Sequence, residues 1–180
     1  MSVRSIRLAM RRIFLFVLVL VAMAVHVTAA EYKTIASGVQ YTRIGDYDVP
    51  RLNRILTTEA ANFSAFKVQY PPAENAVRLY RVRYSTVIPE LGNRPTTASG
   101  LVAVPLTAQK KLPVVSYQHG TVFTKTAVPS RPEESDETRI VVARLAGHEG
   151  QVVAIQRGSG CLCGQTVGKF FHGLALARKG

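Results

Sequence analysis

The 180-residue sequence has only two cysteines, Cys161 and Cys163, which stand one residue apart near the C-terminus. A disulfide between such close positions would be strained, and two cysteines supply neither a disulfide framework nor the four ligands of a structural zinc site. We interpret them as unpaired or incidental thiols, although exported chains usually keep few of these. The sequence therefore predicts no metal and no cofactor.

No apolar run reaches the roughly 20 residues that a membrane-spanning helix requires. The run from Ile13 to Val25 follows a start that contains four arginines, and it precedes the small residues 27–30. This is the layout of a secretory signal peptide, so we assign residues 1–30 to a leader that is cleaved after Ala29 or Ala30. We expect a secreted or periplasmic protein that touches a membrane only through this leader, with an uncleaved anchor as the open alternative.

The middle of the chain lacks a Lys/Arg stripe interleaved with aromatic residues. The net charge of +12 is shared equally by the leader, by residues 31–150 and by residues 151–180, and the middle region holds 15 basic and 11 acidic residues. Mixed signs of this kind are typical of an ordinary solvated surface. We therefore expect no nucleic-acid partner.

Apolar residues recur at helical spacing from Leu52 to Phe66, which predicts a helix. Asp48 and Pro50 supply its start signal, and the prolines at 71 and 72 end it because they lack a backbone donor. We expect residues 31–75 to form an N-terminal helical segment.

Three strands are predicted next. Residues 76–88 and 98–105 each have strand composition, and the turn-rich connector 89–95 between them predicts an antiparallel pair. The continuous apolar start of residues 112–117 predicts a strand that is covered on both faces.

A helix and a further strand follow. Residues 135–147 begin with a capping Ser135, carry two acids in the first turn and end at Gly147, which predicts a helix. Residues 151–155 predict the strand after it, and strand, helix and strand with short links form a parallel βαβ unit. The predicted fold class is α/β, an antiparallel hairpin followed by a parallel βαβ unit.

This order of elements, with ASGLVAVP at 98–105 and VVSYQHGT at 114–121, resembles the N-terminal part of exported α/β-hydrolases of the secretory lipase and esterase type. The resemblance covers about residues 76–155. It implies an incomplete α/β-hydrolase-like sheet whose third strand ends in a His-Gly oxyanion loop. The implied loop residues are His119, Gly120, Thr121 and Val122.

The chemistry explains why the resemblance assigns a function to this loop. Acyl transfer builds negative charge on a carbonyl oxygen, and amides fixed in a turn bind that charge without reorganising. The resemblance implies a backbone donor at Thr121 or Val122, with His119 and Gly120 shaping the loop; glycine allows close approach because it has no Cβ. The alternative is that Gly120 only turns the chain and His119 is a packed or solvated side chain.

The sequence departs from the family after Ile155. The family expects a nucleophilic serine in a G-x-S-x-G elbow, then an acid and a histidine, and no such elbow occurs in these 180 residues. We interpret residues 76–156 as a partial hydrolase domain, truncated or frame-shifted after about residue 155, and residues 157–180 as an irregular tail rich in glycine, cysteine and basic residues. No catalytic residue is assigned.

Four other patterns carry weaker signals. The serine of Gly158-Ser159-Gly160 lacks glycines two residues to either side, and residues 164–170 are one residue short of a phosphate-binding loop and have Phe170 in place of its Ser or Thr. We expect His148 and Glu149 to be an exposed loop pair. The segment around His172 predicts an unstructured end, with a membrane-touching surface helix as the alternative.

The resemblance implies a secreted serine-hydrolase-like protein of the carboxylic ester hydrolase class, whose parent enzyme would take an ester or lipid substrate. We expect this chain to be inactive, because an oxyanion loop cannot replace a nucleophile and its base. The alternative is a non-catalytic secreted protein that binds an apolar ligand or partner. The family's strand order also leaves residues 112–117 at an exposed edge, which predicts self-association and poor solubility.

Overall fold

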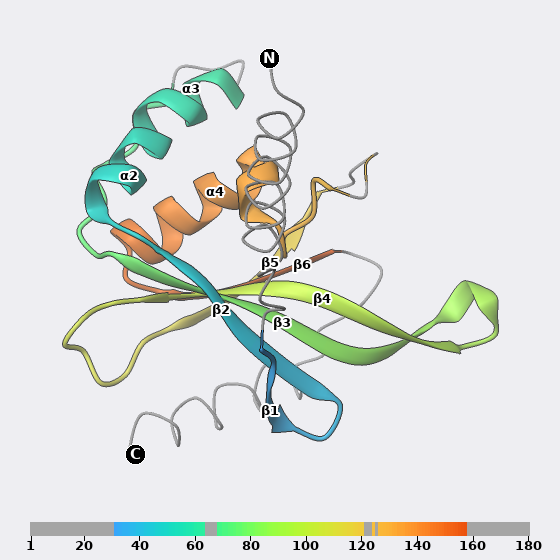
Figure 1. Ribbon diagram of the computed structural model, residues 1–180. Helices are drawn as coiled ribbons and strands as arrows, with labels where there is room; N and C mark the ends of the chain where they lie inside the picture. Colours follow the sequence, from blue (N-terminus) through green and yellow to red (C-terminus); the bar gives the residue numbers. More distant parts are fainter. Residues whose placement is uncertain (1–30, 64–67, 121–123, 125, 158–180) are drawn as a thin grey trace, which may run out of the picture. The chain divides into compact units, whose positions relative to one another are not determined.

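The structure, a computed structural model, describes residues 31–63, 68–120, 124 and 126–157. All of them except Glu31 belong to one compact unit, Tyr32–Gly180. Within that unit a six-stranded sheet has the order β1-β2-β3-β4-β6-β5, and the helices lie over one of its faces (Figure 1). No helix in the described part of the chain has the length and apolar character needed to cross a bilayer.

The described part of the chain contains six strands and three α-helices, and two of these helices continue as π-helical turns. The described elements are β1 (Lys33–Ala36), β2 (Val39–Tyr47), α2 (Val49–Arg54) with π-helical turns at Ile55–Glu59, α3 (Ala60–Phe63), β3 (Val77–Ile88), a 3-10 turn (Pro89–Leu91), β4 (Arg94–Pro105), β5 (Val114–His119), a 3-10 turn (Pro132–Glu134), α4 (Asp136–Val141) with π-helical turns at Val142–His148, and β6 (Val152–Arg157).

The predicted hairpin and βαβ unit are both present. β3 and β4 pair antiparallel along their whole length, from Val77 opposite Pro105 to Ile88 opposite Arg94. β5 and β6 pair parallel, and β6 lies between β5 and β4, to which it is antiparallel. The fold class predicted from the sequence, α/β with an antiparallel hairpin followed by a parallel βαβ unit, is therefore confirmed.

The helical interpretation of residues 31–75 is wrong for their first part. Residues 33–47 form β1 and β2, and β2 pairs antiparallel with β3 from Val39 to Tyr47. Both of these end residues are buried, which ties the strand to the sheet. The helix begins at Val49, where the carboxylate of Asp48 accepts the Arg51 amide at 2.8 Å and caps the first turn.

β5 is not covered on both faces, contrary to the prediction from its apolar start. Its side chains alternate in exposure, and 48% of the Val114 surface is exposed. The strand has β6 on one side only and forms an edge of the described sheet. The apolar side chains of β6 are buried on both faces of the sheet, as are those of β4 from Leu101 to Val104, because they belong to the apolar clusters on the two faces.

The apolar core lies on both faces of the sheet. On one face, the first and last helical segments pack against the strands, and side chains of successive strands are buried below them. On the other face, a second cluster is made by the alternate residues of the same strands. The helical-face set includes Leu52, Ile55, Val77, Leu79, Leu101, Val142, Ala146, Val153 and Ile155, and the set on the opposite face is Val39, Val82, Tyr84, Val102, Val104, Val152 and Ala154.

Gly147 lies inside the helical segment and does not end it, so the predicted end is one residue early. The carbonyl of Gly147 accepts the amides of Glu74 and Asn75, both at 2.9 Å. A Cβ at Gly147 would lie 3.1 Å from the Leu52 Cδ1 atom, so the glycine permits close packing of the two helical segments. The left-handed residue that follows the helix is Gly150, with φ of +67°.

Candidate functional site

His119 is the last residue of β5, and its imidazole is buried against the start of α4. Its Nδ1 lies 2.9 Å from the carbonyl oxygen of Gly120, and its Nε2 lies 2.9 Å from the hydroxyl of Ser135. A carbonyl oxygen only accepts, so the contact with Gly120 places a proton on Nδ1. Both ring nitrogens are therefore used within the fold.

The carboxylate of Glu137, in the first turn of α4, joins the end of β5 to the helix. Its Oε1 accepts from the Tyr117 hydroxyl at 2.8 Å and from the Gly120 amide at 3.1 Å. Its Oε2 lies 3.4 Å from Nε2 of His119. We call these four residues, Tyr117, His119, Gly120 and Glu137, the Glu137 cluster.

Gly120 is a glycine for a packing reason in this cluster. A Cβ at this position would lie 3.3 Å from Oε2 of Glu137, which is closer than ordinary van der Waals contact. The missing side chain thus makes room for a carboxylate, and the Gly120 amide is occupied by it. This amide is consequently not available to a substrate while the bond to Glu137 is made.

The other two residues of the predicted oxyanion loop, Thr121 and Val122, lie outside the described residues. The structure places His119 and Gly120 together at the carboxyl end of β5, next to the end of β6, where His119 pairs with Arg157. Ligand sites of open α/β sheets lie at the carboxyl ends of parallel strands. The assignment of a backbone donor at Thr121 or Val122 stays a prediction.

The pair formed by Ser135 and His119 has the distance of a nucleophile and its base, but its surroundings exclude that role. The Ser135 hydroxyl caps α4: it accepts the Thr138 amide at 3.2 Å and lies 2.8 Å from the Thr138 hydroxyl. Ser135 is only 5% exposed and His119 is 5% exposed. The hydroxyl is a helix cap and offers no approach to a substrate.

Sequence reasoning missed the part that Glu137 plays. It assigned Glu137 only as one of two acids that favour the first turn of a helix. The available signal was that Tyr117, His119 and Gly120 lie at the end of a strand. A βαβ unit brings this end next to the start of its helix. Only the packing of α4 on β5 decided which of the acids faces the strand.

Several other sequence candidates can now be placed. His148 is not part of an exposed loop, since it is the last residue of the π-helical segment and its Nδ1 lies 2.7 Å from the carbonyl of Pro72. Glu149 is paired with Arg144 at 3.0 Å. No group of three or more His, Cys, Asp or Glu side chains within the described ranges is arranged to hold a metal ion. The leader 1–30, Gly158-Ser159-Gly160, Cys161, Cys163, residues 164–170 and His172 lie outside the described residues.

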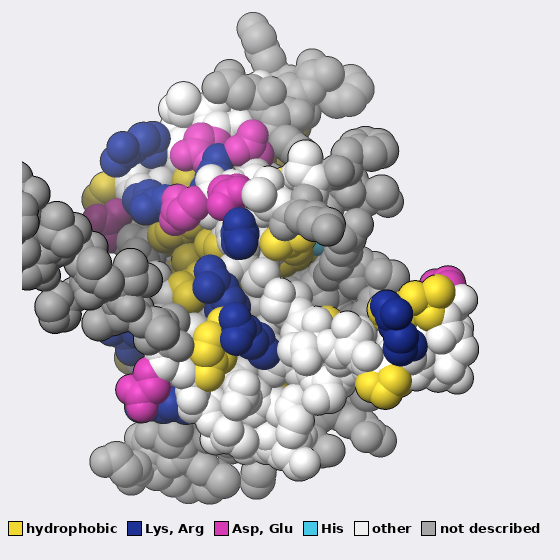
Figure 2. Space-filling model, turned by 45° about the vertical axis from the view of Figure 1, so that its right-hand side comes forward, with side chains coloured by type: hydrophobic (Ala, Val, Ile, Leu, Met, Phe, Trp, Pro, Cys, Tyr) yellow, Lys and Arg dark blue, Asp and Glu magenta, His cyan; other side chains and the backbone are white. Residues whose placement is uncertain are grey.

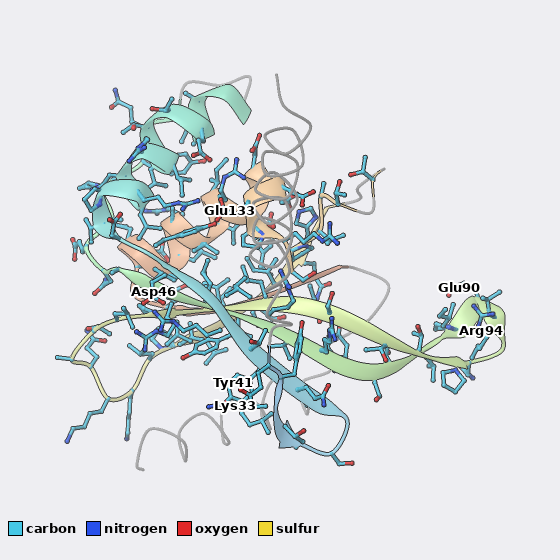
Figure 3. The ribbon with its side chains drawn as sticks, in the orientation of Figure 1. Lys33, Tyr41, Asp46, Glu90, Arg94 and Glu133 are labelled. Carbon is cyan, nitrogen blue, oxygen red and sulfur yellow. The ribbon has the colours of Figure 1, made fainter. Side chains whose placement is uncertain are left out.

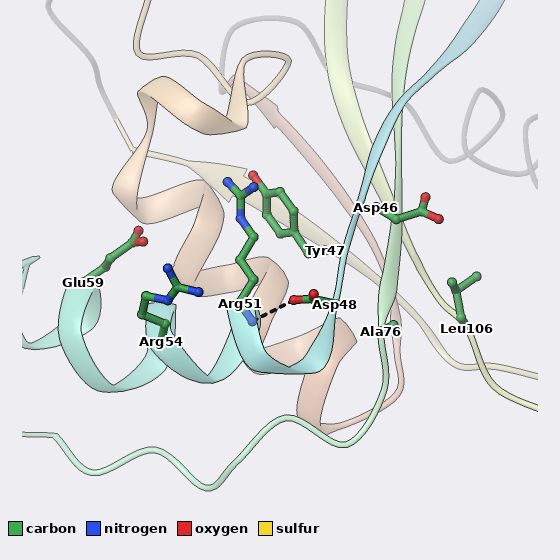
Figure 4. A pocket seen from close by; sticks show the side chains of 8 residues that line it. All are labelled: Asp46, Tyr47, Asp48, Arg51, Arg54, Glu59, Ala76 and Leu106. Atoms are coloured by element: carbon green, nitrogen blue, oxygen red, sulfur yellow. Dashed lines mark hydrogen bonds between the residues drawn. The ribbon is translucent and has the colours of Figure 1, made fainter.

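A cleft of about 620 Å³ is lined by residues that include Asp46, Tyr47, Ala76 and Leu106 (Figure 4). Ala76 and Leu106 adjoin the start of β3 and the end of β4, which is the end of the sheet opposite to the carboxyl end of β5. Asp46 in its wall forms ion pairs with Arg43 and Arg78, and Asp48 caps α2. The Arg51 guanidinium binds Glu133 at 2.5 Å and lies over the Tyr47 ring. These charges are used in structural pairs, so the cleft is a poorer candidate for catalysis than the end of β5.

The environment of Tyr117 leads to a prediction for its titration at alkaline pH. Burial, together with the hydrogen bond to Glu137, raises the pKa of Tyr117 to about 12. The neutral phenol is favoured in the folded state, so this stabilisation is present below the unfolded pKa near 10 and is lost as the pH rises through 12. We expect an ultraviolet tyrosinate titration of the Tyr117→Phe variant to lack the component near 12. A variant that instead loses a component near 10 would contradict the burial and the hydrogen bond.

Comparison with solved structures adds to this geometry. A protein of Legionella pneumophila, provisionally described as a hydrolase, superposes with a TM-score of 0.54 and 25% sequence identity over 68% of this chain. The fold is α/β-hydrolase-like. The rice cell wall degrading esterase LipA of Xanthomonas oryzae gives a TM-score of 0.48 and 19% identity over 72% of this chain. No protein-family model matches the sequence, and no curated protein matches it.

The chain spans about a third of the length of these proteins, 31% of the Legionella chain and 30% of the Xanthomonas esterase. In this α/β-hydrolase-like fold, the Glu137 cluster lies at the end of the sheet where β5 and β6 both terminate.

Proposed function

We propose that this chain carries the oxyanion side of a carboxylic ester hydrolase site of the esterase or lipase class, in a secreted protein. The observation that supports this is the exit of β5 through His119 and Gly120 at the carboxyl edge of an α/β-hydrolase-like sheet. The composition of residues 1–30 supports export. The G-x-S-x-G elbow is absent from the 180 residues, so the nucleophile and base of the proposed site would come from outside this sequence.

The substrate class follows from the same proposal. Amides fixed in a turn bind a developing oxyanion, and a carboxylic ester forms one when its carbonyl is attacked. With the Gly120 amide bonded to Glu137, the donors would be the next amides of the loop, at Thr121 or Val122. A non-catalytic protein that binds an apolar ligand or partner is the second candidate, because the nucleophile elbow is missing.

A chromogenic ester tests the two candidates. We expect the purified chain to cleave p-nitrophenyl butyrate roughly a millionfold more slowly than an enzyme with an intact serine triad, since the oxyanion contribution alone remains. The Thr121→Pro variant, which lacks one amide donor, should remove even this trace. The measurement is the release of p-nitrophenol from equal amounts of both proteins, purified in the same way.

Each outcome bears on a different part of the proposal. Turnover at the rate of an ordinary esterase would show that the chain is a complete enzyme and would overturn its proposed inactivity. A trace that Thr121→Pro leaves unchanged would overturn the donor assignment. No cleavage by either protein would favour the non-catalytic binding protein.

A further inference from the structure

The ends of β3 and β4 continue beyond the sheet as a two-stranded arm, residues 86–97. The last β3 residue with a partner in β2 is Tyr84, and β6 pairs with β4 only at residues 101–103. Within the arm the two strands pair only with each other, in the cross-strand pairs from Thr86 opposite Thr96 to the tip. Figure 1 shows this ribbon projecting away from the helices and the other strands.

The arm projects from the same end of the sheet as the candidate site. β4 is antiparallel to β6, and Leu101 lies opposite Ile155, so the N-terminal part of β4 extends past the carboxyl end of β6. At about 3.4 Å per residue, Arg94 lies roughly 17 Å beyond the level of Arg157. His119 pairs with Arg157, so the arm overhangs the edge at which β5 ends.

The tip of the arm carries exposed apolar side chains. Val87 is 42% exposed and Leu91 is 54% exposed, two of the five large apolar residues in the described chain that are this exposed. The turn at the tip contains Gly92 and Asn93, with φ of +64° and +60°, and a Cβ at Gly92 would meet no atom within 4 Å. An isolated two-stranded ribbon is only marginally stable in water. Apolar side chains that stay exposed at its tip therefore add little to the stability of the fold.

The charge of the arm is balanced. Glu90 and Arg94 are its only charged residues, and Figure 3 shows both at its far end. Figure 2 shows hydrophobic side chains beside one basic and one acidic side chain on this protruding lobe. The remaining arm positions hold mainly threonine, proline and asparagine, so the tip presents apolar side chains with little net electrostatic field.

We propose that the tip of this arm, Val87 and Leu91, inserts into a lipid–water interface and holds the carboxyl edge of the sheet against it. A convex apolar tip offers no groove for a small ligand, and its neutral charge suits a zwitterionic lipid surface better than a charged macromolecule. Apolar side chains on one end of a polar element bind an interface in proportion to the apolar area that they bury. The proposal goes beyond the ester hydrolase function, and its test needs no ester turnover, so the two can fail separately.

The absence of tryptophan from the chain makes a local test possible. A Leu91→Trp variant of the full chain places a single indole at the tip, and a Leu106→Trp variant places one at a 37% exposed site at the opposite end of β4. Both are mixed with phosphatidylcholine vesicles in 0.15 M salt, with and without brominated lipid. We expect the emission of the Leu91→Trp protein to shift to shorter wavelength and to be quenched by brominated lipid, and that of the Leu106→Trp protein to stay unchanged.

A second measurement uses the arm without an added indole. In vesicle sedimentation, the Val87→Ser/Leu91→Ser variant should partition about tenfold less than the unmodified chain, because two partly exposed apolar side chains no longer enter the lipid. The matched Leu106→Ser/Val114→Ser variant should partition like the unmodified chain. The leader is the same in all of these proteins, so its own affinity for the vesicles contributes equally to each of the partition measurements that are compared.

Three results would overturn the proposal. The first is equal partitioning of the arm variant and the unmodified chain, and the second is an unchanged emission spectrum of the Leu91→Trp protein with vesicles. The third is a Leu91→Trp emission that shifts with protein concentration in the absence of lipid, which would show that the arm contacts a second copy of the chain. Circular dichroism confirms that each variant is folded.

Discussion

Replacement of Glu137 by leucine is expected to lower the free energy of unfolding by about 3 kcal/mol, because it leaves two hydrogen-bond donors without an acceptor. The hydroxyl of Tyr117 and the amide of Gly120 both donate to this carboxylate, and Nε2 of His119 lies 3.4 Å from it. Urea unfolding of the two proteins measures the difference. We also expect the Gly120 amide to exchange its hydrogen faster in the variant, since its only described acceptor is removed.

Two controls separate the Glu137 cluster from a general effect of charge. Glu134 pairs with Arg131 at 3.6 Å, and both of these side chains are about half exposed. Glu134→Leu should therefore change the stability by less than about 1 kcal/mol. Glu137→Gln keeps an acceptor oxygen and should cost less than Glu137→Leu. Equal losses for Glu134→Leu and Glu137→Leu would contradict the connection between β5 and α4 described above.

Replacement of Arg139 by methionine is expected to cost about 3 kcal/mol, because this guanidinium joins the two helical segments. Arg139 binds Glu59 at 2.5 Å, and it also contacts the carboxylate of Asp136 and the backbone carbonyls of Pro132 and Glu133. Only 13% of its side chain is exposed. Removing one partner of a largely buried ion pair leaves the other charge without compensation, which is the costly case.

Thermal unfolding of a double-mutant cycle tests this account. The Arg139→Met/Glu59→Leu double variant should be more stable than Arg139→Met alone, since the stranded carboxylate is removed with its partner. Arg131→Met is the matched control, because its pair with Glu134 is exposed and should contribute less than about 1 kcal/mol. Additive losses in the cycle would show that the Glu59 contact does not contribute to the effect of Arg139.

Local signals in the sequence were sufficient for most of the elements. Aspartate and proline at residues 48 and 50 marked the start of α2, Ser135 marked the start of α4, and strand composition marked β3 and β4. These signals act through the backbone over a few residues, so they can be interpreted without knowing the fold. The resemblance implied a strand order that leaves residues 112–117 at an edge, and β5 is an edge strand of the described sheet.

The sequence by itself determined local features: where α2 and α4 begin, which segments form β3 to β6, and that a strand ends at His119 and Gly120. The tertiary structure alone decided which side of each element is covered. It placed β1 and β2 in the sheet, left one side of β5 exposed, and turned Glu137 toward Gly120. Burial and hydrogen bonding between distant segments depend on which elements become neighbours. The pattern of apolar residues within one segment does not show which other element will pack against it.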